Sequence, residues 1–181
     1  MRNFVIALVG LLFIVSCNST QSAAKTTENL KSLSEWVDGK KIKVVANSAS
    51  PLAANEFANF GLLPQGSTAN RIFLTGNDFI SIKGDHVVVD LPYYGVRQQS
   101  TAFDYNNSGV RFEGIPDHYE VKYDEKRRTY TMEMELKNGK EAFDVMIKLY
   151  PTLRATIHVN TTRRTAISYQ ARVKELPADT K

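Results

Sequence analysis

The chain has 181 residues, a formal net charge of +4 and a single cysteine. That length suffices for one domain with a substantial core, and the single cysteine excludes an internal disulfide, so packing must stabilise the fold. The basic residues are scattered, and no run of them is longer than Lys126 to Arg128. This distribution is typical of a solvated surface and does not indicate a nucleic-acid-binding protein.

The N-terminus has the features of a bacterial export signal. Arg2 is a short basic region, and the apolar run from Phe4 to Val15 is shorter than the roughly 20 residues that span a bilayer. The run ends in Ile14-Val15-Ser16-Cys17, which resembles a lipobox. This resemblance implies a signal peptide over residues 1–16 and acylation of Cys17, for example by palmitate. The alternative is an ordinary secretory signal with a chance cysteine.

Residues 17–26 follow the predicted cleavage site and are rich in Ser, Thr, Ala and Gln without periodicity. They are therefore predicted to form a flexible, lipid-anchored tether. Asn18 stands where inner-membrane lipoproteins commonly have Asp, and no acidic cluster follows Cys17, unlike in most surface-exported lipoproteins of Bacteroidetes. By that resemblance the chain is an outer-membrane lipoprotein that faces the periplasm. Inner-membrane retention and surface exposure remain the alternatives.

Residues 27–181 are predicted to be a single β-rich domain that begins with its one helix. The helix is expected from Thr27 to Asp38, because Leu30, Leu33 and Val37 recur at helical spacing. The first strand is expected directly afterwards, over residues 41–47. Residues 51–64 fit either a short helix or a long loop that packs its aromatic residues.

From residue 71 onward the chain alternates apolar and polar residues in short segments, which is typical of strands with one buried face. Gly84-Asp85 and Asn138-Gly139 between such segments predict tight hairpin turns. The intervals are too short for helical crossovers, so the strands should pair antiparallel. The sequence thus predicts a mainly β fold, an antiparallel meander that is either a curled sheet or a flattened barrel. The predicted strands are Arg71–Leu74, Asp78–Lys83, Val87–Leu91, Thr101–Tyr105, Val110–Glu113, His118–Asp124, Thr129–Lys137, Glu141–Tyr150, Leu153–Val159 and Thr165–Lys174.

Three short segments of the chain resemble a known family. They are Leu91-Pro92-Tyr93-Tyr94-Gly95, Gly109-Val110-Arg111-Phe112 and Arg164-Thr165-Ala166-Ile167-Ser168-Tyr169. Together they resemble the Bacteroidetes lipoprotein family catalogued as the domain of unknown function numbered 4251, in which Phe is usual at the position of Tyr94. The resemblance covers roughly Val44 to Val173. It implies an exported, membrane-anchored domain, and it implies no activity because the family has none assigned.

The sequence offers few residues in patterns that carry chemistry. His86, His118 and His158 fall on polar strand faces without the spacing of a metal site, and Asp90 lies on the same strand face as His86. Glu133 and Glu135 share a strand face, and a pair of carboxylates is what a glycosidase uses, but such pairs commonly form a charged outer surface. We therefore predict no catalytic residue, no metal and no cofactor.

The candidate binding residues lie where the strand of Val87–Leu91 ends. Pro92 stops the strand, and Tyr93 and Tyr94 follow on a stiff turn, with Arg97 available for a carboxylate or phosphate. The alternative is that the tyrosines cap the core. The sequence favours a non-catalytic binding module of the cell envelope whose partner is the membrane, an envelope protein or an anionic glycan. An envelope hydrolase acting on glycan or peptide is the alternative.

Overall fold

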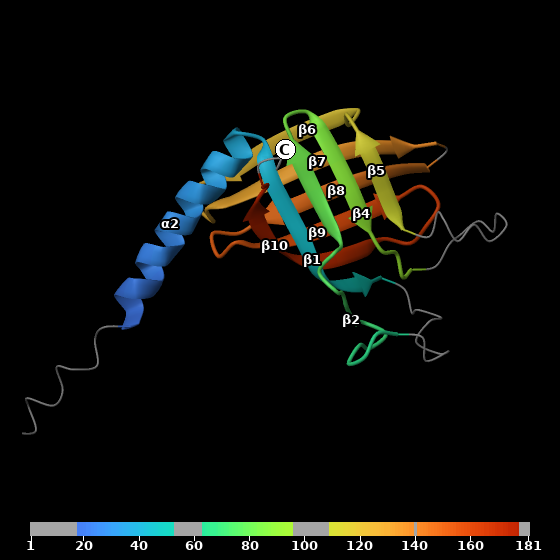
Figure 1. Cartoon of the computed structure of the whole chain (residues 1–181), viewed down its shortest axis with the longest axis horizontal. Coiled ribbons are helices and arrows are strands. Elements are labelled where there is room, and N and C mark those ends of the chain that lie inside the picture. The colour runs from blue at the N-terminus through green and yellow to red at the C-terminus, as the bar shows by residue number, and fades with distance from the viewer. Residues whose placement is uncertain (1–17, 53–62, 96–108, 140, 178–181) are drawn as a thin grey trace, which may run out of the picture.

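Ten strands form one antiparallel sheet in the computed structural model (Figure 1), which describes residues 18–52, 63–95, 109–139 and 141–177. The order of the strands is β5-β4-β3-β1-β10-β9-β8-β7-β6, with the short β2 beside β1. This confirms the predicted antiparallel β fold. The strands are β1 (Lys41–Pro51), β2 (Ile72–Phe73), β3 (Phe79–Lys83), β4 (His86–Leu91), β5 (Val110–Gly114), β6 (His118–Asp124), β7 (Thr129–Asn138), β8 (Glu141–Leu149), β9 (Arg154–Thr161) and β10 (Ile167–Glu175).

The alternation of side chains along each strand divides the sheet into a buried and a solvated face. In β8, Phe143, Val145, Ile147 and Leu149 are all buried, whereas the residues between them are exposed or half-buried. The register aligns these side chains with the buried ones of the neighbouring strands, for example Val145 with Met134. Period-two alternation therefore assembles one continuous apolar core, as expected for an antiparallel sheet that buries one face.

The sheet curls so strongly that its two ends approach each other. Strand β5, at one end of the strand order, contacts β7, which lies near the other end. Asn138 Nδ2 donates a hydrogen bond of 2.8 Å to the carbonyl of Arg111 across this approach. Among the described strands, β5 pairs only with β4 and β6 pairs only with β7. The fold is therefore a curled half-barrel that stays open between β5 and β6.

One helix, α2 (Asn18–Asp38), precedes the sheet. Its C-terminal half adds Leu33 and Val37 to the core, and Leu30 and Trp36 pack against it. The N-terminal half extends away from the sheet (Figure 1). Within the part of the chain that the structure describes, no helix is long and apolar enough to cross a membrane.

The helix begins earlier than predicted, at Asn18 instead of Thr27, so the segment expected to be a flexible tether is helical. The prediction relied on apolar periodicity, which this segment lacks. Once the packed C-terminal half has nucleated the helix, however, each further residue adds a backbone hydrogen bond at low cost. Cys17 itself and the signal segment lie outside the described residues.

Most strand boundaries differ from the prediction by a few residues, and two of these differences have a clear structural cause. Strand β1 continues to Pro51 through a bulge between Ala46 and Ser48, which interrupts the alternation that the sequence pattern follows. The hairpin between β7 and β8 forms as predicted, but its register pairs Asn138 with Glu141, so Asn138 remains in the strand and Gly139 takes a φ of 59°. The predicted strand 101–105 and most of segment 51–64 lie outside the described residues.

Candidate functional site

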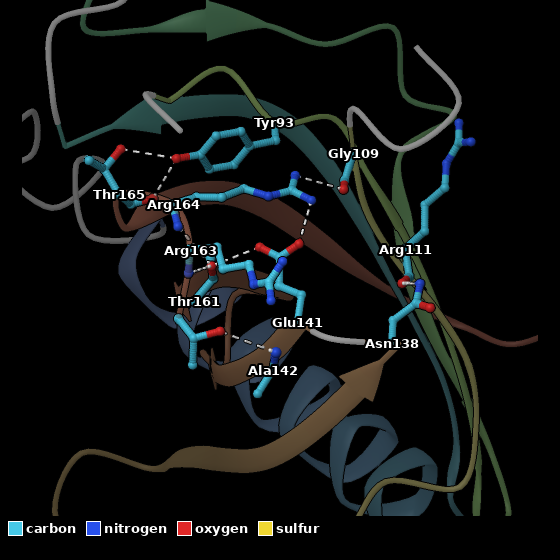
Figure 2. Close-up of polar contacts among 11 residues, drawn as sticks. Tyr93, Gly109, Arg111, Asn138, Glu141, Ala142, Thr161, Arg163, Arg164 and Thr165 are labelled. Carbon is cyan, nitrogen blue, oxygen red and sulfur yellow. Dashed lines mark hydrogen bonds and ion pairs between the residues drawn. The ribbon is translucent and has the colours of Figure 1, made fainter. Parts of the chain in front are cut away.

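The three sequence segments that resemble the family meet at one end of the sheet, in a buried polar cluster (Figure 2). We call Tyr93, Gly109, Glu141, Thr161 and Arg164 the closure cluster. Tyr93 follows β4, Gly109 precedes β5, Glu141 begins β8 and Thr161 ends β9. Arg164 lies in the connection from β9 to β10. The cluster therefore joins segments from both halves of the curled sheet.

Arg164 is the centre of this cluster and is only 6% exposed. Its Nη2 lies 2.7 Å from Oε2 of Glu141, and its Nη1 donates a 3.0 Å hydrogen bond to the carbonyl of Gly109. The guanidinium also lies over the ring of Tyr93, at 5.1 Å from its centroid. A buried charge is tolerated only when it is paired and hydrogen-bonded, and here both conditions are met.

Thr161 fixes the carboxylate that pairs with Arg164. Its hydroxyl donates a 2.9 Å hydrogen bond to Oε1 of Glu141. Oγ1 of Thr161 also accepts hydrogen bonds from the backbone amides of Arg163 and Arg164, at 3.0 and 3.1 Å. Local bonds of this type are common where Ser or Thr precedes a turn. One side chain thus shapes the β9–β10 connection and orients the ion pair.

Tyr93 is buried, with 8% of its surface exposed, and its hydroxyl donates to the carbonyl of Thr165 over 2.8 Å. Burial raises the pKa of this phenol. Gly95 is required next to it, because a Cβ at that position would overlap Oη of Tyr93 and lie 2.7 Å from Oγ1 of Thr165. The Leu-Pro-Tyr-Tyr-Gly segment therefore packs the end of the sheet against the β9–β10 connection.

The structure describes two of the three predicted binding residues, Tyr93 and Tyr94. Tyr93 takes the position that the core-capping alternative describes, buried beside Arg164. Tyr94 is half-buried against the core. Its pKa is raised mainly by desolvation and, to a smaller extent, by the nearby charge of Asp78. Arg97 lies outside the described residues. A role of Tyr93, Tyr94 and Arg97 in binding stays a prediction.

The histidines and acids considered for catalysis lie on the solvated face of the sheet. His86 Nε2 is 3.7 Å from Glu113, and Nδ1 of His158 is 2.8 Å from the hydroxyl of Ser168. Glu133 lies 3.1 Å from Lys122. Within the described residues there is no group of three or more His, Cys, Asp or Glu side chains that could hold a metal ion.

His118 and Glu135 are directly opposite each other on β6 and β7, also on the solvated face. His118 Nε2 lies 3.9 Å from Glu120, and more than half of the His118 side chain is exposed. Asp90 on β4 pairs with Arg111 on β5 at 3.1 Å. The structure therefore spreads the candidate acids and bases over several strands instead of gathering them in one place.

A second charged region, which sequence reasoning missed, covers the solvated face of four adjacent strands, β3, β1, β10 and β9. Three direct cross-strand pairs there carry like charge, and we call their six members the basic face. The pairs are Lys41 with Lys83, Lys43 with Lys174, and Arg172 with Arg154. Lys43 is half-buried, with Nζ 4.0 Å from the Phe79 ring centroid, and the other five are exposed.

The sequence alone did not predict the basic face, because its residues come from distant parts of the chain. The signal was present, since Lys41, Lys43, Arg172 and Lys174 occupy the polar positions of two predicted strands. Only the register shows that these strands are neighbours. Charge runs along the sequence do not detect such a patch.

The fold and its closure cluster define a small curled-sheet domain with one N-terminal helix, and comparison with known proteins gives its family. The model of the family described as Domain of unknown function (DUF4251) matches residues 24–173, so the chain belongs to this family. No curated protein matches the chain.

One similar solved structure is the crystal structure of a DUF4251 family protein from Bacteroides eggerthii DSM 20697 at 1.95 Å resolution. It has a TM-score of 0.53 and 13% sequence identity, and the alignment covers 84% of this chain and 89% of that chain. At this identity the likeness establishes the fold alone.

Proposed function

We propose that this chain is a lipid-anchored protein of the cell envelope whose β domain is a non-catalytic binding module for an anionic glycan. The observation that carries the proposal is the basic face. Like charges directly opposite each other on neighbouring strands destabilise a sheet, and here three such pairs share one solvated face. An anionic ligand removes this repulsion when it binds.

The spacing of the basic face suits a repeating anion. Neighbouring strands lie about 4.8 Å apart, and residues of one face recur about every 6.6 Å along a strand. The three pairs therefore present charge over an area broader than one phosphate or carboxylate. A polymer that carries an anionic group on each repeat meets several of these cations at once, which raises its affinity by multivalency.

The closure cluster supports binding over chemistry. Arg164 and Glu141 are the most buried ion pair of the described residues, with side chains only 4% and 13% exposed. Their hydrogen bonds are used within the protein, to Gly109 and Thr161. Groups used in this way stabilise the domain and present little to a substrate.

The N-terminus supports the anchoring part of the proposal. The lipobox-like segment ends at Cys17, and α2 begins at the next residue. A helix of 21 residues is about 30 Å long, and its first half extends away from the sheet (Figure 1). In our proposal this helix holds the domain away from the membrane surface, and two or more acyl chains on Cys17 give stable attachment.

Growth of the producing cells with labelled palmitate tests the anchor. We expect the wild-type chain to take up label and to fractionate with membranes, and Cys17→Ala to do neither. Label incorporation by Cys17→Ala would contradict acylation at this residue.

Binding to dextran sulfate, with uncharged dextran as the reference, tests the module. The full chain in a mild detergent should bind dextran sulfate alone, and Lys43→Gln/Lys174→Gln should weaken binding at least about tenfold, because two cations of the face are lost. Lys126→Gln/Arg127→Gln, which removes the same charge from the exposed β6–β7 turn, is the matched control. Equal loss in both double variants would contradict a specific basic face.

Vesicles containing an anionic phospholipid form the third arm of this experiment. Binding of Cys17→Ala to these vesicles, with no binding to dextran sulfate, would assign the basic face to the membrane and overturn the glycan proposal. Binding to the polymer that exceeds binding to vesicles at equal anion concentration supports it.

A further inference from the structure

Strand β6 (His118–Asp124) is an edge strand of the sheet within the part of the chain that the structure describes. Among the described strands it pairs with β7 alone, and no described strand pairs with its other side. Proteins usually protect such edges, because the row of backbone donors and acceptors can pair with another strand. Here two apolar side chains of the edge are also exposed, Val121 by 36% and Tyr123 by 44%. The edge therefore has the properties of a docking surface.

The sequence of β6 has a centre at Val121. Residues equally far from Val121 on either side are either both tyrosine or of opposite charge type. It reads His-Tyr-Glu-Val-Lys-Tyr-Asp. If a second copy of β6 lies antiparallel with Val121 opposite Val121, then Glu120 faces Lys122, Tyr119 faces Tyr123 and His118 faces Asp124. Each of these pairs occurs twice because of the two-fold symmetry. We propose that two copies of this chain associate through β6, pairing edge to edge in this register.

Both faces of the paired strands would be complementary. On the face of β6 that continues the buried face of the sheet, Tyr123 already packs against Tyr130 with ring centroids 4.6 Å apart. Tyr119 and Val121 are the other two apolar side chains of this row. The second copy extends this row with the same three side chains. Cross-strand aromatic and β-branched pairs are among the contacts that stabilise a sheet.

On the solvated face, the second copy would offset the repulsion between two carboxylates. Glu120 lies directly opposite Glu133 of β7, and Lys122 lies 3.0 Å from Glu120 and 3.1 Å from Glu133. One lysine thus serves two carboxylates in the single molecule. Lys122 of the second copy would add a second lysine, directly opposite Glu120.

The neighbouring registers are excluded by charge. A shift by two residues in one direction places Glu120 opposite Asp124 and Lys122 opposite Lys122. A shift in the other direction places Glu120 opposite Glu120 and His118 opposite Lys122. A shift by one residue mixes the apolar and charged faces. Only the register centred on Val121 satisfies both faces of the strand, which is why we assign this partner and this register.

Sedimentation velocity of the full chain in density-matched detergent, over a range of concentrations, tests the proposal. We expect a reversible monomer–dimer equilibrium for the wild type. Lys122→Glu places Glu opposite Glu120 twice per dimer and should weaken the dimer at least about tenfold, because like charges across an interface repel. Lys174→Glu makes the same charge change on β10, which is paired on both sides, and should leave the dimer intact.

The double variant Glu120→Lys/Lys122→Glu exchanges the two charges and recreates every complementary pair. It should restore dimerisation, which a merely destabilised fold would not do. A wild-type chain that stays monomeric, a dimer unaffected by Lys122→Glu, or a charge exchange that fails to restore it would each overturn the proposal.

Cysteine cross-linking tests the register itself. Val121→Cys would lie opposite its own symmetry mate and should form a disulfide-linked dimer under mild oxidation. Met146→Cys is the control, because Met146 is 43% exposed on β8, in the interior of the sheet. The wild type controls for Cys17. Cross-linking of Val121→Cys no faster than that of Met146→Cys would contradict the register.

Discussion

The closure cluster and the basic face both contain arginine, yet the fold treats their charges in opposite ways. Arg164 is buried, paired with Glu141 and bonded to a backbone carbonyl. Arg172, on the basic face, is exposed and lies directly opposite Arg154. The buried charge is compensated within the protein, whereas the exposed pair places like charges opposite each other, and in our proposal an external anion relieves that repulsion. In our proposal, this difference separates residues that stabilise the fold from residues available to a partner.

The largest effect on stability is expected from removing the buried arginine. Arg164→Ala should lower the free energy of unfolding by about 3–5 kcal/mol, because Glu141 is left as an unpaired buried charge. Arg172→Ala is the matched exposed control and should change stability by less than about 0.5 kcal/mol. Urea denaturation of both variants measures the two values. Equal effects would show that burial does not distinguish the two arginines.

The packing of the closure cluster is tested at Gly95. Gly95→Ala should cost about 1–3 kcal/mol of stability, since its Cβ overlaps Oη of Tyr93. Gly76→Asn is the control, because Gly76 has open space around it and a φ of 87°, in a region that Asn tolerates better than most residues. A thermal unfolding series compares them. A larger loss for Gly76→Asn than for Gly95→Ala would contradict the tight packing.

Tyr119 offers a stabilising change on the apolar side of β6. Its buried hydroxyl has no hydrogen-bond partner among the described residues. Tyr119→Phe removes this unpaired group and should raise the free energy of unfolding by about 1 kcal/mol. Tyr123→Phe, at an exposed position of the same strand, should have little effect on urea unfolding. Destabilisation by Tyr119→Phe would indicate that the hydroxyl is bonded.

Tyr119 also predicts the response to alkaline pH. Burial raises the pKa of Tyr119 to about 12, from 10.0 for an unperturbed tyrosine. The folded state therefore keeps a proton that the unfolded state loses, so stability is full below about pH 10 and falls as pH rises toward 12. Urea unfolding between pH 9 and 11, roughly, should show a shallower decline for Tyr119→Phe than for the wild type. Identical slopes would contradict the raised pKa.

The smallest effect is expected on the basic face. Lys43→Gln/Lys174→Gln relieves one like-charge pair and should leave stability unchanged or raise it by about 0.2–1 kcal/mol, even though we expect it to weaken polyanion binding. Urea unfolding at low salt measures this gain, which high salt should reduce. A clear loss of stability would mean that these lysines have a structural role.

The sequence predicted the fold better than the charged sites, for a physical reason. Alternation in strands such as β7 and β8 determines which side chains are buried, and it needs no knowledge of which strands are neighbours. The closure cluster and the basic face both depend on register and on the curl of the sheet. Tyr93 could be placed at a strand end, but its burial follows from Thr165 and Arg164, which are about 70 residues away.

The same reason explains the helix boundary. Leu33 and Val37 gave a clear periodic signal, and both are buried. The segment from Asn18 to Thr27 gave none, because its helical state does not depend on an apolar face. Apolar periodicity reports burial, so it gives no signal for a helical segment that does not depend on an apolar face.

A double-mutant cycle between Arg164 and Glu141 tests most directly whether the closure cluster holds the domain together. Arg164→Met and Glu141→Gln each break the 2.7 Å ion pair, and the double variant leaves no unpaired charge. We predict a coupling free energy of unfolding of at least about 1.5 kcal/mol, with the double variant more stable than the two single losses combined would suggest. A coupling energy below about 0.5 kcal/mol would contradict a stabilising role of the closure cluster.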